Sequence, residues 1–200
     1  NIAKDRLPIH ALFATGAVQH ALVNSGLRCR TNIIVETATT RDPHQFACLI
    51  GYGATAVYPY LAYQTISELI EMGQVDYNLE KACANFRKGI DKGLLKILSK
   101  MGISTVQSYH SAQIFEAVGF KQEFVDQYFA GTVSRVGGLG VADVQREENQ
   151  RYDDAVAILN TPAPEQLPSL GLTKWRPQGG EEHLIDPQTI YLLQTACRED

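Results

Sequence analysis

A strand–helix–strand pattern near the start of the chain constrains its fold more than any other feature. The β-branched run at 32–36 predicts a short buried strand, and the run at 56–58 predicts a second one. Asp42 and Pro43 lie between them and predict a helix over 44–50, because Asp caps a first turn and Pro fits the first helical position. Strands joined through a helix pair in parallel, so we predict an α/β fold.

Helical segments dominate the rest of the predicted structure. Apolar spacing predicts helices over 15–27, 62–72, 112–118, 122–129, 144–159 and 187–197. Asn78 caps a longer helical pattern in which Gly89 and Gly93 favour two helices or a bend. The remaining expectations are a strand over 103–109, a glycine-rich turn at 137–140 and a proline-rich extended connection over 161–180.

Composition and charge exclude two classes of function. The chain has 200 residues, enough for one domain or parts of two, and is 44% hydrophobic and 20% charged. A net charge of -4 and scattered Lys and Arg argue against nucleic-acid binding. No apolar run approaches the roughly 18 residues of a membrane span. Residue 1 is Asn and no initiator Met precedes it, so we expect an internal segment of a longer chain.

Cysteine and histidine spacing gives no metal site and no catalytic thiol. The four cysteines are far apart and form no CxxC pair, which is typical of reduced thiols in a cytosolic protein; a disulfide is the alternative. None of the five histidines has a second ligand at metal-binding spacing. We therefore predict no metal ligands and no catalytic residues in this chain.

Two glycine-rich strings could bind phosphate, and each has a simpler reading. The string 51–54 resembles half of a dinucleotide fingerprint but follows a helix, so a turn at a helix end is favoured. The string 137–140 precedes a helix and could hold an anion, but no Lys or Ser/Thr of a phosphate loop follows it. A flexible turn is favoured there.

A candidate ligand site flanks the predicted strand at 103–109. Polar side chains at strand ends suit a bound ligand, whereas surface polar groups around a capped turn are the alternative. His110 is a further candidate, because it would follow the carboxyl end of that strand. The candidate residues are Ser99, Lys100, Met101, Gly102, Gln107, Ser108 and Tyr109.

Four long strings resemble the large subunit of glutamate synthases, in the order and spacing of that family. They are HALFATGAVQHALVNSGLR (10–28), HQFACLIGYGATAVYPYLA (44–62), KGLLKILSKMGISTVQSYHSAQIFEAVGF (92–120) and GGEEHLIDPQTIYLLQ (179–194). The resemblance implies the end of the central domain over 1–62, a helical junction over 63–92 and the start of the FMN-binding barrel over 93–200. The expected fold is thus β-α-β alternation leading into an incomplete TIM-barrel-like domain.

The resemblance also implies a reaction for the parent enzyme. Glutamine-derived ammonia adds to 2-oxoglutarate, and reduced FMN delivers a hydride to the imine, which gives L-glutamate. Electrons reach FMN through an iron–sulfur cluster from an NADPH-linked small subunit or ferredoxin. The seven candidate residues would approach one face of the flavin, while the flavin phosphate and cluster sites would lie outside this chain. We expect a cytoplasmic or plastid protein and a homo-oligomer.

The chain departs from the family pattern at several positions. His110-Ser111 stands where Arg-Gly is common, and Gln19 and Gln45 stand where a second His is frequent. Tyr58 replaces a frequent Asn. The isolated segment is expected to be inactive, and a structural module without ligand or catalysis is the alternative function.

Overall fold

The computed structural model describes residues 6–159, 174–177 and 180–198. The chain divides into two compact units, 1–153 and 154–200, which are described separately. Most of the predicted connection over 161–180 lies outside the described residues. Within the described ranges, no helix has the length and apolar composition needed to cross a membrane.

The first strand–helix–strand unit forms at the predicted positions, but its strands are less buried than expected, since Val35 is the one buried residue of the two strands. Helix α1 (Ala11–Asn24) and a 3₁₀ turn, η1 (Arg28–Arg30), precede β1 (Ile34–Glu36), α2 (Pro43–Gly51) and β2 (Ala56–Tyr58). The strands pair in parallel, with Val35 opposite Val57. At the start of α2, the Asp42 carboxylate accepts the Gln45 N–H at 3.0 Å, and the Gln45 side chain bonds back to Asp42, a capping box. The core of this unit consists of Ile33, Val35, Leu49 and Ala54.

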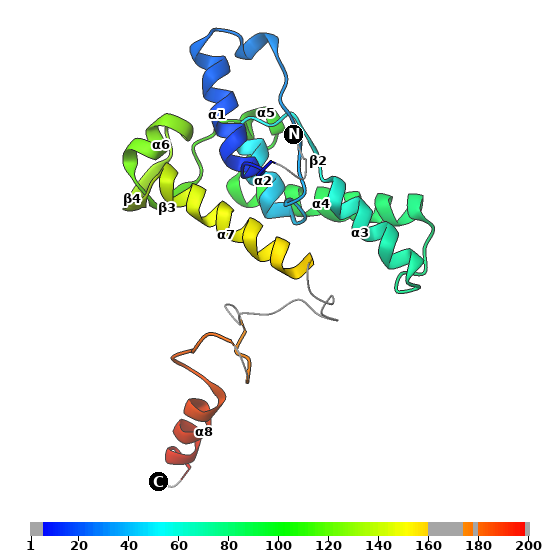
Figure 1. Cartoon of the computed structure of the whole chain (residues 1–200), viewed down its shortest axis with the longest axis vertical. Helices are drawn as coiled ribbons and strands as arrows, with labels where there is room; N and C mark the ends of the chain where they lie inside the picture. The colour runs from blue at the N-terminus through cyan, green and yellow to red at the C-terminus, as the bar shows by residue number, and fades with distance from the viewer. Residues whose placement is uncertain (1–5, 160–173, 178–179, 199–200) are drawn as a thin grey trace. The chain divides into compact units, whose positions relative to one another are not determined.

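Two helices then run side by side, α3 (Tyr60–Glu71) and α4 (Leu79–Met101), as Figure 1 shows. Asn78 caps α4 as predicted, accepting the Lys81 N–H at 2.8 Å. The expectation of two helices here is wrong, because α4 continues through both glycines for 23 residues. Gly93 packs against the Pro43 ring at the start of α2. The close contact between the two helices explains why a glycine, which has no side chain, occupies this position.

Three expectations for 103–140 are also wrong. The predicted strand over 103–109 is a short helix, α5 (Val106–Tyr109), because the Thr105 side chain caps it by accepting the Ser108 N–H. The predicted helix over 112–118 gives way to β3 (Glu116–Phe120). Most of the predicted glycine-rich turn lies in β4 (Val133–Leu139), which pairs with β3 in parallel. Gly138 lets the Gly119 carbonyl approach closely, so this glycine serves strand pairing.

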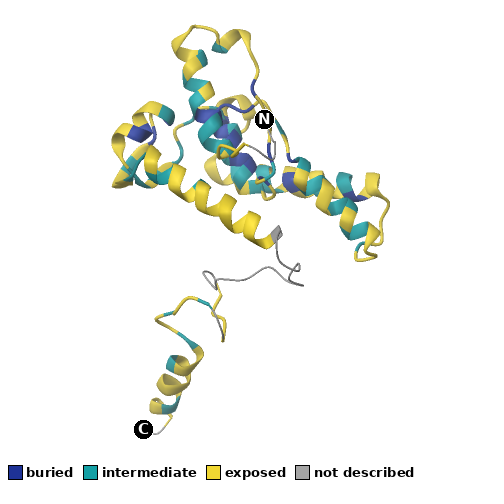
Figure 2. Cartoon of the chain, in the orientation of Figure 1, coloured by how far each residue is buried: buried dark blue, intermediate teal, exposed yellow. Residues whose placement is uncertain are grey.

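A second core lies around α6 (Gln122–Tyr128), which connects β3 to β4 and confirms the predicted helix over 122–129. Phe124, Val125 and Phe129 are buried there, and the Phe13 ring of α1 lies 5.2 Å from the Phe124 ring. Figure 2 shows buried residues gathered in α2 and α6, whereas α7 (Val141–Leu159) is largely exposed.

The fold is therefore mixed α/β, with two short parallel sheets of two strands each. Within the described residues, these strands close no barrel. In the second unit, α8 (Pro187–Ala196) forms as predicted, with the Asp186 carboxylate accepting the Thr189 N–H at 2.7 Å.

Candidate functional site

The seven predicted site residues lie on two helices, on either side of a short link at 103–105. Ser99, Lys100 and Met101 form the exposed last turn of α4, which ends at Gly102 with a left-handed φ of 69°. The other three belong to α5, where Gln107 and Ser108 are exposed and Tyr109 is buried. The strand expected to present these side chains is absent, so their assignment to a ligand site stays a prediction.

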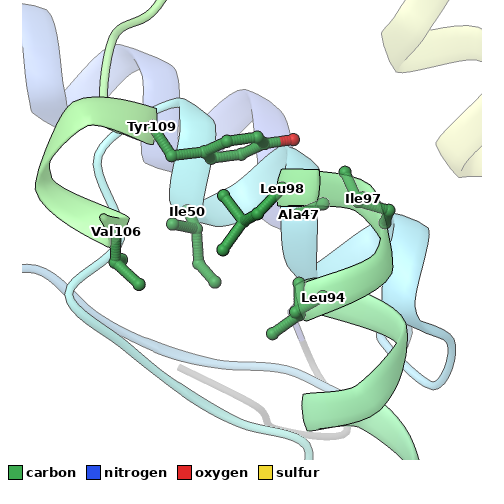
Figure 3. A pocket seen from close by; sticks show the side chains of 7 residues that line it. All are labelled: Ala47, Ile50, Leu94, Ile97, Leu98, Val106 and Tyr109. Carbon is green, nitrogen blue, oxygen red and sulfur yellow. The ribbon is translucent and has the colours of Figure 1, made fainter. Parts of the chain in front are cut away.

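Tyr109 alone among the seven residues lines a small apolar hollow, where α2, α4 and α5 meet (Figure 3). The hollow measures about 30 Å³, whereas small-molecule sites measure about 300–1,000 Å³. No polar atom faces it, so it is a packing gap between helices. Its lining residues are Ala47, Ile50, Leu94, Ile97, Leu98, Val106 and Tyr109.

Several parts of the chain contact the turn at the end of α2, and we call residues 51–54 the α2 junction. The Gly53 N–H donates to the Ile50 carbonyl at 3.0 Å and the Ala54 N–H to the Leu49 carbonyl at 2.9 Å, which is a Schellman motif. With φ at 110°, Gly53 occupies a conformation that other residues rarely adopt. The prediction of a helix-end turn at 51–54 is confirmed.

Side chains distant in sequence converge on the α2 junction. Arg28 donates to the Gly53 carbonyl at 2.9 Å and also to the Gln19 side chain, which packs on Gly53. The Phe115 ring stacks on Tyr52 at 5.4 Å and covers the face of Gly51 where a side chain would be. Glycines at the end of a helix were the signal that could have predicted such close neighbours.

Two titratable side chains at this junction have shifted pKa values. Burial raises the pKa of Tyr52, whose hydroxyl lies 2.7 Å from the Thr132 hydroxyl. Burial lowers the pKa of His110, the positive charge of Arg28 lowers it further, and a hydrogen bond with the Ala54 backbone opposes both. The His110 Nε2 atom is buried and has no hydrogen-bond partner. His110 follows a helix and not, as expected, a strand.

The described residues contain no group of three or more side chains able to hold a metal ion. His44 and Cys48 approach to 3.6 Å, but burial and then Asp42 raise the pKa of the thiol, which disfavours the reactive thiolate. All four cysteines are free thiols.

A contact within the chain occupies the N–H group of the glycine-rich segment that lies at the start of α7. The Gly140 N–H donates to the Asp143 carboxylate at 2.9 Å, and this bond is the main cause of the lowered pKa of Asp143. The negative group at the start of α7 is therefore the Asp143 carboxylate of the chain itself.

Comparison with known proteins relates the chain to glutamate synthases. A family model described as the glutamate synthase central domain matches residues 1–121, and so extends beyond residue 62, where that domain was expected to end. The division at 62 and 92 stays a prediction.

Curated relatives are similar over nearly the whole chain. The large chain of the NADPH glutamate synthase of Bacillus subtilis is 43% identical over 96% of this chain. Ferredoxin-dependent glutamate synthase 2 of Synechocystis sp. is 44% identical over 94%, and the chloroplastic ferredoxin-dependent enzyme of Spinacia oleracea is 42% identical over 96%. The matched region is 12% of each of these relatives.

Proposed function

This chain belongs to the glutamate synthase family, and from that premise we propose that it is part of a large chain that makes L-glutamate. In the proposed reaction, glutamine-derived ammonia is transferred to 2-oxoglutarate and the product is reduced. The observation that carries the proposal is identity of about 40% over almost the whole chain to several glutamate synthases. Because the chain covers only 12% of these relatives, the activity belongs to the complete enzyme.

FMN is the cofactor proposed for the parent enzyme, but the described residues do not fit it by themselves. The hollow near Tyr109 holds about 30 Å³, close to the space of one water, and its lining offers no polar atom to the flavin. Lys100 could meet a negative group of the cofactor, yet it lies on an exposed helix end. We therefore derive no catalytic step through FMN in this chain.

What this chain would contribute is one edge of a site that other parts of the enzyme complete. The exposed side chains of Ser99, Lys100, Gln107 and Ser108 are available to a ligand held against this surface. The iron–sulfur cluster of the parent enzyme would be held elsewhere, because the four cysteines are far apart in the sequence.

We propose that residues outside this segment determine which electron donor the enzyme uses. Relatives named for NADPH and for ferredoxin are 43% and 44% identical to the chain, so the segment carries no preference for either. The proposed partners are the rest of the large chain, a donor of one of these types and further copies of the enzyme. Relatives from a bacterium and from chloroplasts support the cytoplasm or the plastid as location.

A structural module is the second candidate function. It is favoured by the contacts at the α2 junction and by the lack of a ligand-sized hollow at Tyr109. In this role the segment would hold neighbouring parts of the enzyme in place without touching a ligand.

Substitutions in the complete enzyme separate the two candidates. Lys100→Ala and Gln107→Ala should lower glutamate formation and flavin reduction while glutamine hydrolysis continues, since the two reactions occur at separate sites. Lys96→Ala, which removes another exposed lysine of α4, is the matched control and should change neither reaction. Unchanged glutamate formation in both variants would support the structural module. Loss of glutaminase activity with normal flavin reduction would refute the placement beside FMN.

A further inference from the structure

His110 has a structural position that the proposed reaction does not use. Its Nε2 atom is buried without a hydrogen-bond partner, and the ring lies near the Ala54 backbone, whose effect on the pKa of His110 opposes that of burial. A neutral imidazole needs a proton on only one of its nitrogens, so a neutral ring can leave a lone pair on the unpartnered Nε2. A second proton would add a donor at Nε2 with no acceptor beside it, together with a charge on a half-buried ring.

The charged group that acts on this ring is itself positive. Arg28 of η1 is held in place by its bonds to Gln19, to the Thr31 carbonyl at 2.8 Å and to the Gly53 carbonyl at 2.9 Å. It therefore cannot easily move away from a protonated His110. The other titratable groups on these elements are His20 on α1, Cys29 and Arg30 on η1, His44, Cys48 and Tyr52 on α2, and Tyr109 on α5, and none of them supplies a negative charge near neutral pH. The Asp42 carboxylate caps the opposite end of α2 from the α2 junction.

The residues that follow His110 are held in an unfavourable backbone conformation. Ser111 and Gln113 have φ of 57° and 53°, in the left-handed region that side chains disfavour. The Ser111 N–H donates to the Gly51 carbonyl at 2.8 Å, and the Gln113 side chain packs on Gly131. These contacts fix the segment in place, and their loss would let both backbones relax.

We propose that His110 is an acid-sensitive latch: its neutral ring holds residues 110–113 against the α2 junction, and protonation releases them. Because the closed state favours the neutral ring, the latch contributes its full stability above the ordinary pKa of histidine, about 6.5. The contribution falls as the pH drops below that value, since the open state then takes up the proton first. One titrating group changes the opening equilibrium by at most about tenfold per pH unit. This inference does not depend on the reaction proposed above.

Hydrogen exchange followed by mass spectrometry tests the latch in the full-length protein that carries this sequence. Exchange is measured at pH 7.5, 6.5 and 5.5, with labelling times corrected for the intrinsic pH dependence of amide exchange. We expect peptides that contain the Ser111 amide to lose protection at pH 5.5, by no more than about tenfold per pH unit. Peptides from α3 serve as the internal reference and should not change with them.

Variants of His110 test whether its ring causes the loss of protection at acid pH. His110→Asn places an amide near the position of Nδ1 and removes the titrating group, so the acid response of 110–113 should disappear; His110→Gln is a second neutral variant. His44→Gln is the matched control, because His44 is exposed on α2, and it should keep the response.

Three results would overturn the latch. The first is equal protection of 110–113 at pH 7.5 and 5.5 in the unmodified protein, and the second is an unchanged acid response in both His110 variants. The third is an opening that spreads to α3 or rises more steeply than one proton allows, because that would be general acid unfolding. The measurements on the unmodified protein decide the first and third results even if a variant fails to fold.

Discussion

Replacing Gly93 by Ala should destabilise the protein, although alanine is the better helix former. Gly93 lies inside α4, and a Cβ atom there would overlap the Pro43 ring at the start of α2. A proline ring cannot swing aside like the end of a long side chain, so one of the two helices must shift. Gly89 lies one turn earlier in α4 and is exposed, and no atom lies near the position of its missing Cβ.

The two glycines separate helix propensity from packing. Alanine in place of an exposed helical glycine should stabilise the fold by about 0.8–1.0 kcal/mol, which is the expected gain for Gly89→Ala. Gly93→Ala has the same gain but also overpacks the α2–α4 contact, which costs about 1–3 kcal/mol. The net change for Gly93→Ala therefore ranges from near zero to about 2 kcal/mol of destabilisation. The difference between the two variants should be about 1–3 kcal/mol.

Urea unfolding followed by circular dichroism gives the free energy of unfolding of both variants and of the unmodified chain, and heating gives their thermal midpoints. Thermal midpoints should differ by about 2–4 °C for each kcal/mol in a chain of this size. The double variant Pro43→Ala/Gly93→Ala removes Cγ of the ring, the atom nearest to the added Cβ, but keeps the Cβ of residue 43, so it should recover only part of the loss. If Gly93→Ala stabilised the chain as much as Gly89→Ala, the close approach of α2 and α4 would be refuted.

Three further predictions concern the junction, the cofactor and the thiols. Tyr52→Phe should lower the free energy of unfolding by about 1–3 kcal/mol, because it leaves the buried Thr132 hydroxyl without its partner; Tyr58→Phe, on an exposed tyrosine, is the control, and equal effects would contradict the argument. The isolated 200-residue chain should bind FMN weakly or not at all in a fluorescence titration, and stoichiometric sub-micromolar binding would contradict the view that this chain holds only an edge of the site. A chromogenic thiol assay in denaturant without reductant should find four thiols, and a count of two or zero would reveal a disulfide.

Local sequence signals were sufficient to predict a helix where the capping residue and the first helical residues are themselves diagnostic. Asp42 with Pro43 predicted α2, and Asp186 with Pro187 predicted α8, because a capping carboxylate and a proline act within one turn. The parallel pairing of β1 and β2 followed from the helix between them. These features depend on neighbours in the sequence.

Prediction failed where distant residues decide the structure. The glycines of 137–140 resemble a turn, but most of that segment pairs with β3, and Gly138 allows the close approach of the Gly119 carbonyl. The β-branched residues near 103–106 favour a strand, yet Thr105 caps a short helix there, and that helix buries Tyr109. The candidate ligand site depended on that strand, which is why its residues were named without the geometry that would present them. His110 was singled out for the same reason, and its buried Nε2 could not be foreseen.

The two small sheets explain why the segment needs a larger structure around it. Parallel strands are normally covered on both faces, and two strands alone are marginally stable in water. Here Ile34 of β1 and Val118 of β3 are 73% and 71% exposed, and Val136 of β4 is 57% exposed. Side chains of this kind gain stability only when another surface removes them from water. Within the described residues no further strand or helix covers them, and relatives about eight times as long, given the 12% match, have the additional chain to do so. The α2 junction then fixes the position of the two sheets within one unit, so that both meet the rest of the enzyme in a defined orientation.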